Sequence, residues 1–128
     1  MIDLPPYARL LNLRIEEGPT GPRVVMPFGD DVVGRPGYLH GGAIAGLLEF
    51  AAFTGLSRAL GDAKAAMKPI TLTVDYMRGG RDSLGDTLAE AVIERVGARI
   101  ANVEAFAWQK DRSRPIAAAR INFLIERP

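Results

Sequence analysis

One carboxylate stands alone in the most apolar stretch of this chain. Between Gly41 and Ser57 the only ionisable side chain is Glu49. An unpaired carboxylate is costly to bury, and carboxyl groups in apolar clefts have raised pKa values and gather at functional sites. Glu49 is therefore the first candidate for general-base or nucleophilic chemistry. In the alternative, structural interpretation, Glu49 lies on an exposed strip or pairs with Arg35 or Arg58.

The second candidate is the sequence His40-Gly41-Gly42, directly before that stretch. Glycines let a ligand come close to the backbone, and the first free N–H groups of a helix favour a developing negative oxygen. This is the geometry of an oxyanion hole. The alternative is a plain loop-to-helix turn, with His40 as a capping or core residue.

Glu49 and Gly41 cannot easily serve one site within one helix. Their spacing corresponds to about 12 Å along a helix axis and about 80° around it. Two helices running antiparallel about a two-fold axis would bring Glu49 of one copy near Gly41 of the other. Gly46 and Gly55 each weaken a helix by about 1 kcal/mol relative to alanine. We interpret both glycines as sites of close approach by another backbone, which fits such a pair.

The residue types that are missing exclude several chemistries. The 128 residues include no cysteine and one histidine, which excludes disulfides, thiolate nucleophiles and metal sites built on two histidines. None of the serines lies in a G-x-S-x-G elbow. We expect no metal ion at this site, whose chemistry must use carboxylates, one imidazole, arginines and backbone groups.

Charge and hydropathy exclude further classes of protein. The formal net charge is +1, from 16 basic and 15 acidic residues, so the chain lacks the basic excess of a nucleic-acid binder. It has no signal-peptide pattern, and its longest nearly uncharged stretch is shorter than the roughly 20 apolar residues of a membrane span. We therefore expect a cytoplasmic protein without nucleic-acid or membrane partners.

The hydrophobic periods predict a single α+β domain over residues 1–128. A helix over 42–60, apolar on nearly every face and ended by Gly61, should be buried all round. The alternation over 70–76 predicts a half-buried strand. One helix covering an antiparallel sheet of about five to six strands is an α+β layout. We expect a short helix at 5–11, and strands at 13–17, 23–27, 70–76, 87–96, 99–110 and 116–126.

The thirteen residues from His40 to Ala52 (HGGAIAGLLEFAA) resemble the H-G-G-x(6)-[DE]-x-x-A signature of hotdog-fold acyl-CoA thioesterases. The most similar group is the phenylacetate-pathway (PaaI-like) thioesterases. Residues 71–78 resemble the first long strand of the family and residues 85–99 its next strand and turn, so the resemblance spans about 30–126. It implies a hotdog fold, in which an antiparallel sheet wraps a long helix. It also implies homodimers that often pair into tetramers, with active sites at the dimer interface.

The resemblance implies a role for each residue of the signature. Glu49 would be the general base or nucleophile. The Gly41 N–H would polarise the thioester carbonyl. His40 and Gly42 would shape and orient the turn.

This sequence departs from the family pattern at three places. Many relatives carry Asn or Gln six residues before the histidine, where this chain has Gly34. Some place Ser or Thr just before the first long strand, where Thr71 is only an approximate substitute. The usual proline after Arg78 is Gly79. These departures leave open a chain that binds acyl thioesters without efficient turnover.

The implied substrate is an aryl- or medium-chain acyl-CoA, and coenzyme A enters as part of it rather than as a cofactor. The acyl group would lie in an apolar pocket between helix and sheet, and the depth of this pocket depends on how Phe50, Phe53, Met67 and Tyr76 pack. The phosphates of coenzyme A require arginines, of which Arg78 and Arg99 are the preferred candidates. The other candidates near turns are Arg81, Arg95, Arg112 and Arg114. Two alternatives stay open: a hotdog hydratase or dehydratase, which also pairs a histidine with an acid, and a non-catalytic acyl-CoA-binding module.

Overall fold

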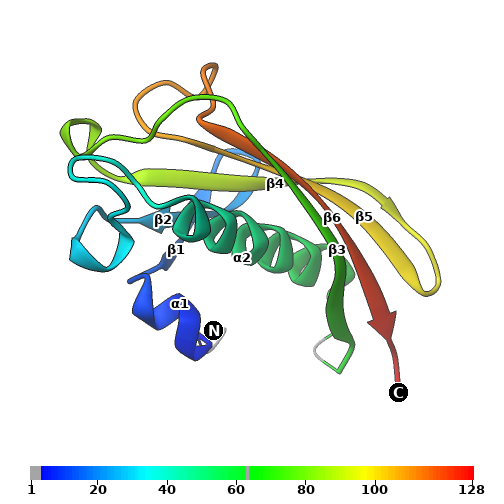
Figure 1. The fold of residues 1–128 in the computed structure, drawn as a ribbon. Coiled ribbons are helices and arrows are strands. Elements are labelled where there is room, and N and C mark those ends of the chain that lie inside the picture. The colour runs from blue at the N-terminus through cyan, green and yellow to red at the C-terminus, as the bar shows by residue number, and fades with distance from the viewer. Residues whose placement is uncertain (1–3, 63) are drawn as a thin grey trace.

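A six-stranded antiparallel sheet wraps around one long helix (Figure 1). The computed structural model describes residues 4–62 and 64–128. The order of strands across the sheet is β1-β2-β4-β5-β6-β3. This confirms the predicted α+β hotdog architecture. Along the chain the elements are α1 (Pro6–Leu10), β1 (Arg14–Gly18), β2 (Gly21–Met26), α2 (Gly41–Leu60), β3 (Ala66–Tyr76), β4 (Thr87–Val96), β5 (Ile100–Trp108) and β6 (Ala117–Glu126).

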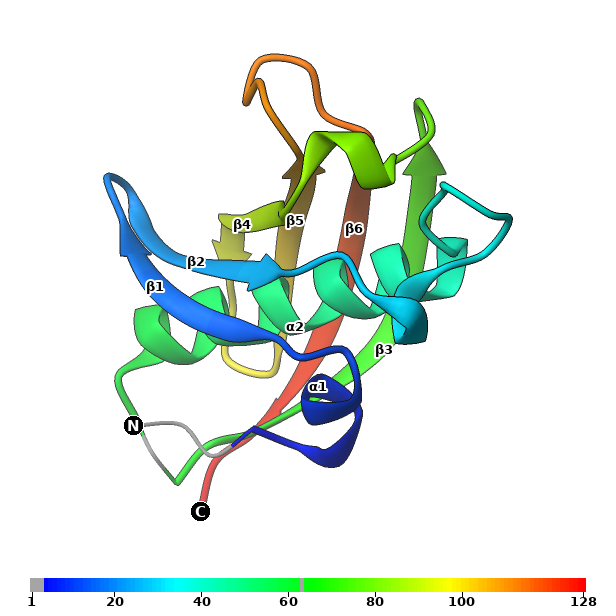
Figure 2. The same ribbon diagram turned by 90° about the vertical axis from the view of Figure 1, so that its left-hand side faces the viewer.

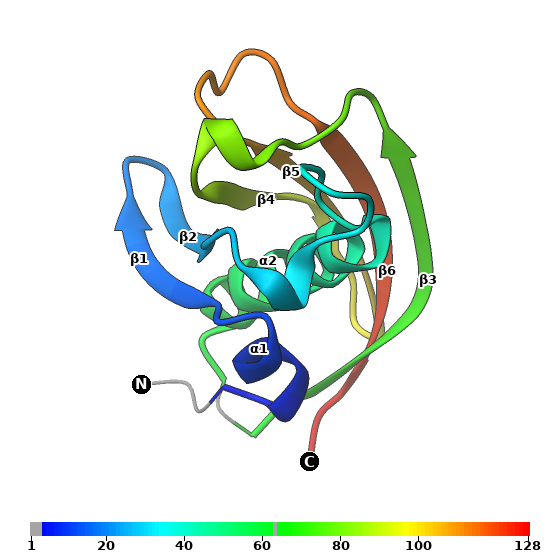
Figure 3. The same cartoon turned by 60° about the vertical axis from the view of Figure 1, so that its left-hand side comes forward.

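Helix α2 lies in the concave face of the sheet (Figure 3). The side chain of His40 caps its start, and Gly61, which has a left-handed φ of 64°, follows its last residue, Leu60. Both ends agree with the sequence prediction within one residue. By length and mean hydropathy this helix passes the test for a membrane span, as buried core helices of soluble proteins also do.

The central strands alternate as their sequence predicts. Val103 of β5 and Ile121 and Phe123 of β6 are buried on the side of the helix. Phe106 and Trp108 of β5 stack against each other on the opposite, outer face. The period of two thus places the core on one side of the sheet.

Both helix glycines allow a close approach, but not by another backbone. A Cβ at Gly55 would lie 2.6 Å from the Cβ of Ala91 on β4. A Cβ at Gly46 would lie 2.7 Å from a ring carbon of Tyr7 on α1. The expectation of a backbone partner is therefore wrong, because side chains of the same chain fill both places. Figure 2 shows α1 beside α2, on the side of the helix that the sheet leaves open.

Strand β3 is an edge of the sheet and pairs only with β6. It begins at Ala66, earlier than predicted, and the expectation that it is half-buried is wrong. Ile70 and Tyr76 are each 55% exposed. The register shifts between Pro69 and Thr71. This irregularity interrupts the alternation at Ile70, and no strand of the described residues covers the far side of β3.

Candidate functional site

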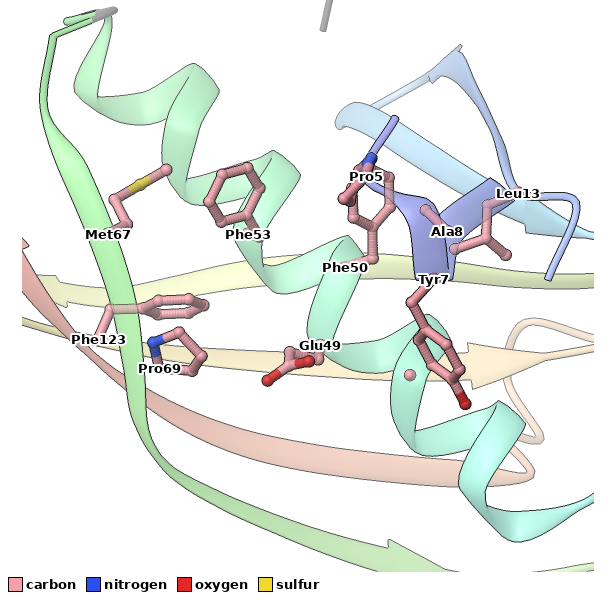
Figure 4. Close-up of a pocket in the computed structure, with 11 residues that line it drawn as sticks. Pro5, Tyr7, Ala8, Leu13, Glu49, Phe50, Phe53, Met67, Pro69 and Phe123 are labelled. Carbon is pink, nitrogen blue, oxygen red and sulfur yellow. The ribbon is translucent and has the colours of Figure 1, made fainter. Parts of the chain in front are cut away.

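A cavity of about 300 Å³ opens between α1, α2, β3 and β6 (Figure 4). Its walls are almost wholly apolar, and three phenylalanines and a tyrosine contribute to them. Phe50, Phe53 and Met67 line it as expected, whereas Tyr76 does not. The lining residues are Pro5, Tyr7, Ala8, Leu13, Gly46, Glu49, Phe50, Phe53, Met67, Pro69 and Phe123.

Glu49 is the only charged side chain among these lining residues. Helix α2 holds it half-buried, and its carboxylate points into the space between α2 and β3, towards Pro69 (Figure 4). No hydrogen bond or ion pair among residues 4–62 and 64–128 engages this carboxylate. It is therefore available to a ligand.

The two structural partners considered for Glu49 are bound elsewhere. Arg58 forms two hydrogen bonds with Glu17, at 3.2 and 2.5 Å. The Arg58 guanidinium lowers the pKa of Glu17, chiefly through these hydrogen bonds. Arg35 instead stacks over the ring of Tyr38, with its guanidinium carbon 5.1 Å from the ring centroid. The interpretation of Glu49 as half of an ion pair with either arginine is therefore wrong.

The start of α2 leaves one backbone donor free. The N–H of Gly42 donates to Nδ1 of His40 at 2.9 Å. The N–H groups of Ala43 and Ile44 both reach the carbonyl of His40, at 3.1 Å each. Within the described part of the chain the N–H of Gly41 has no such partner. Gly41 thus presents the free donor that an oxyanion hole needs.

A tyrosine from the edge strand contacts the same turn. Oη of Tyr76 donates to the carbonyl oxygen of Gly41 at 2.8 Å. Its ring lies 3.4 Å from the position that a Cβ of Gly41 would occupy. Sequence reasoning missed this contact, because 35 residues separate the two positions and no local pattern links them.

Gly34 lies beside His40 and contributes no functional group. A Cβ at this position would lie 3.0 Å from the Cα of His40. The N–H of Gly34 donates to the carbonyl of Tyr38, and the N–H of His40 to that of Val32. This folded-back loop leaves no room for the Asn or Gln of other family members unless the backbone shifts.

The remaining candidates lie away from Glu49 in this chain. Thr71 pairs with Asn122, on the outer face of the sheet. Arg78 donates to the carbonyl of Pro115 at 2.8 Å. Arg99 belongs to the β4–β5 hairpin, at the opposite end of the sheet from the start of α2 (Figure 1).

Arg112, a further candidate for the coenzyme A phosphates, is occupied on the outer face. Its guanidinium contacts the buried carboxylate of Glu90 at 2.8 and 2.9 Å. It also lies over the ring of Trp108. No group of three or more His, Cys, Asp or Glu residues within 4–62 and 64–128 is arranged to hold a metal ion.

One chain does not bring the carboxylate and the free donor together. Glu49 and Gly41 lie on the same regular helix, about 12 Å apart along its axis. The arrangement provides an apolar cavity with one carboxylate in one place, and a free backbone donor in another.

Comparison with known proteins identifies the family of this chain. The family model of the thioesterase superfamily matches residues 36–116, a range that includes His40 and Glu49. A protein from Chromobacterium violaceum is 35% identical, with a TM-score of 0.76, over 93% of this chain and 82% of the other.

Two more distant structures share the fold. A Bacillus halodurans protein solved with CoA has a TM-score of 0.85 and 24% identity, over 98% of this chain and 81% of the other. A phenylacetic acid degradation-related protein from Ralstonia eutropha has a TM-score of 0.81 and 19% identity, over 96% of this chain and 92% of the other. Among curated proteins no match was found.

Proposed function

This chain belongs to the thioesterase superfamily, and from that premise we propose that it hydrolyses acyl-CoA thioesters to a free acid and CoA. The observation that carries the proposal is Glu49, an unpartnered carboxylate in an apolar cavity. The Bacillus halodurans relative of the same fold was solved with CoA, which supports CoA as the thiol carrier here.

Two groups perform the chemistry in this proposal. The Gly41 N–H binds the carbonyl oxygen of the thioester and stabilises the negative charge that develops there, an effect worth about 10²–10³ in rate. As general base, Glu49 takes a proton from a water that attacks the acyl carbon. The C–S bond then breaks, and the CoA thiolate takes that proton. As nucleophile, Glu49 would attack the acyl carbon and form an anhydride, while the C–S bond breaks and CoA leaves as its thiolate. Water then cleaves the anhydride to the free acid and the Glu49 carboxylate, and a proton of that water goes to the thiolate.

The register of β3 supports a model in which two copies complete the site. The Glu49 carboxylate points towards Pro69 (Figure 4), whereas the carbonyl oxygen of Gly41 accepts a hydrogen bond from Tyr76. Two β3 edges paired antiparallel about an axis through Thr73 would place Leu72 opposite Val74. Because the register shifts between Pro69 and Thr71, the same pairing would place Pro69 of one copy opposite Tyr76 of the other. That pairing would bring Glu49 of one copy towards Gly41 of the other.

The surface of β3 supports this homodimer. Its exposed Ile70, Leu72 and Tyr76 are large side chains that a second copy would cover. In such an antiparallel pair, the end of the sheet that carries Arg99 in one copy would lie beside the end that carries the start of α2 in the other. Arg99 and Arg78 would then approach the coenzyme A phosphates from two different copies. Exposed Val92 and other apolar side chains of the outer face offer a surface on which two dimers could pack.

The cavity favours an aryl or medium-chain acyl group. At about 300 Å³ it has roughly twice the volume of the ~150 Å³ apolar cavity that holds a benzene molecule. It can therefore take one ring with a short linker, or a medium chain. Its phenylalanine rings offer edge and face contacts to an aromatic acyl group.

The test is release of free thiol from a panel of CoA thioesters. The panel includes acetyl, hexanoyl, palmitoyl, benzoyl, phenylacetyl and 4-hydroxybenzoyl esters. We expect the wild type to hydrolyse benzoyl, phenylacetyl or hexanoyl esters fastest, and Glu49→Gln to abolish release while the protein stays folded. No release from any ester by a folded protein that binds them would favour a non-catalytic acyl-CoA-binding module.

The shared site has its own test by complementation. Gly41→Pro removes the free N–H at a position where helices tolerate proline, and the extended His40 before it suits a following proline. Mixed Glu49→Ala and Gly41→Pro chains form heterodimers in which one of the two sites is intact. We expect about a quarter of wild-type activity from random mixing. A site within one chain would give none.

A further inference from the structure

Tyr76 ties the edge strand to the turn that carries the proposed oxyanion donor. Its hydroxyl donates to the Gly41 carbonyl at 2.8 Å. Its ring packs against the Gly41 backbone, 3.4 Å from where a Cβ would stand. The side chain nevertheless is not among the residues that line the acyl cavity.

The peptide unit between Gly41 and Gly42 is held at both ends. Tyr76 binds its carbonyl oxygen, and Nδ1 of His40 accepts its N–H at 2.9 Å. Two consecutive glycines have more backbone freedom than any other pair. One neighbouring side chain, His40, and one that is distant in sequence, Tyr76, therefore supply the restraint that the glycines lack.

We infer that Tyr76 is a positioning residue of the thioester site, which holds Gly41 so that its free N–H meets the substrate carbonyl. This inference rests on the proposed function. It follows from geometry, because a donor stabilises the transition state only if it is already placed at 2.7–3.1 Å from the oxyanion. Tyr76 also stands on the strand that a second copy would cover, so assembly and the placement of the donor share one residue.

The experiment compares Tyr76→Phe with the wild type. Phenylalanine keeps the ring and removes only the hydroxyl, so we expect kcat to fall about fivefold, the equivalent of one hydrogen bond, with little change in KM. The matched control is Tyr38→Phe, whose hydroxyl bonds to none of the described residues. Sedimentation at the assay concentration establishes that both variants have the wild-type oligomeric state.

A double-mutant cycle separates positioning from a merely structural role. If Tyr76 acts through the Gly41 N–H, Tyr76→Phe has no further effect in the Gly41→Pro background. An equal fivefold loss in both backgrounds would overturn the inference, as would wild-type kcat in the single variant. Neither result would affect the proposed function, because hydrolysis itself would still be observed.

Amide exchange tests the same residue without any turnover. In ¹⁵N-labelled protein, Tyr76→Phe should speed exchange of the Gly42 amide about fivefold, and Tyr38→Phe should leave it unchanged. Unchanged exchange in Tyr76→Phe would overturn the inference even in an active enzyme. If the wild type hydrolyses no ester, the proposed function fails. Faster exchange of the Gly42 amide would then show only that Tyr76 holds the turn. The inference that Tyr76 positions a donor for the thioester would fail together with the proposed function.

Discussion

Replacing His40 by alanine removes the side-chain cap of helix α2. In the wild type, Nδ1 of His40 accepts the N–H of Gly42 at 2.9 Å, so the neutral ring carries its proton on Nε2. Loss of an N-cap costs about 0.5–2 kcal/mol. Gly42 is exposed, and water can replace part of the lost bond. We therefore expect about 1 kcal/mol for His40→Ala.

The assay is urea unfolding at one fixed protein concentration, because self-association changes the apparent stability. With an m value of about 2 kcal/mol/M, the midpoint should fall by about 0.5 M. His40→Asn should recover most of this loss, since asparagine is among the best N-caps. An alanine variant with the wild-type midpoint, or an asparagine variant no better than alanine, would refute the capping argument.

The same two variants separate the mechanical from the chemical role of the imidazole. If His40 only holds the turn, His40→Asn keeps most of the hydrolysis. If the ring moves a proton, asparagine is as inactive as alanine although the helix is restored. Loss of a hydratase or dehydratase reaction, with hydrolysis spared, would instead favour that alternative function.

Three further predictions concern packing and charge. In Gly46→Ala the new Cβ would lie 2.7 Å from the Tyr7 ring and should displace this ring from the wall of the cavity. We expect the rate with palmitoyl-CoA to rise relative to the rate with hexanoyl-CoA. An unchanged ratio would count against α1 as a wall of the acyl site. Gly55→Ala should lower the urea midpoint, because overpacking against β4 at 2.6 Å costs about 1–3 kcal/mol against a helix gain of about 1 kcal/mol; a higher midpoint would contradict this. The Lys68 ammonium, 2.9 Å from Glu126, lowers the pKa of Glu126 below its ordinary 4.5. This stabilisation is fully present above the unfolded-state pKa and is lost as pH falls through the folded one. The stability difference between wild type and Glu126→Gln should therefore begin to shrink as pH falls towards 4.5 and vanish below the lowered folded pKa. A difference that grows in acid would be the wrong sign.

The features that the sequence could predict depend on neighbours along the chain. The helix end at Gly61 and the buried positions of β6, such as Ile121 and Phe123, follow from a single turn residue and a period of two. The pairing of Glu90 with Arg112 did not follow. Glutamate and arginine are residue types typical of a solvent-exposed face, so the sequence gives no sign that Glu90 is buried. Only the packing of Trp108 and its neighbours on the outer face removes the Glu90 carboxylate from water.

The candidate site was predictable in its parts but not in its connections. Glu49 and the free donor at Gly41 follow from residue type and helix position. The Tyr76 contact joins segments distant in sequence, and the irregularity after Pro69 shifts a strand whose alternation is regular in sequence. Such features depend on tertiary packing, which periodicity does not encode.

The two edges of the sheet have different consequences for how copies of this chain can polymerise. Strand β1 is short, and its sequence RIEEG places charges along that edge, which discourages another strand from adding to it. Strand β3 is long and exposes apolar side chains. An edge that joins only to its own equivalent closes after two copies, whereas a head-to-tail contact between β3 and β1 would continue into a fibre. If β3 forms the proposed dimer, we expect that removing the charges of β1 would open a second edge to pairing and allow the dimers to elongate into fibres.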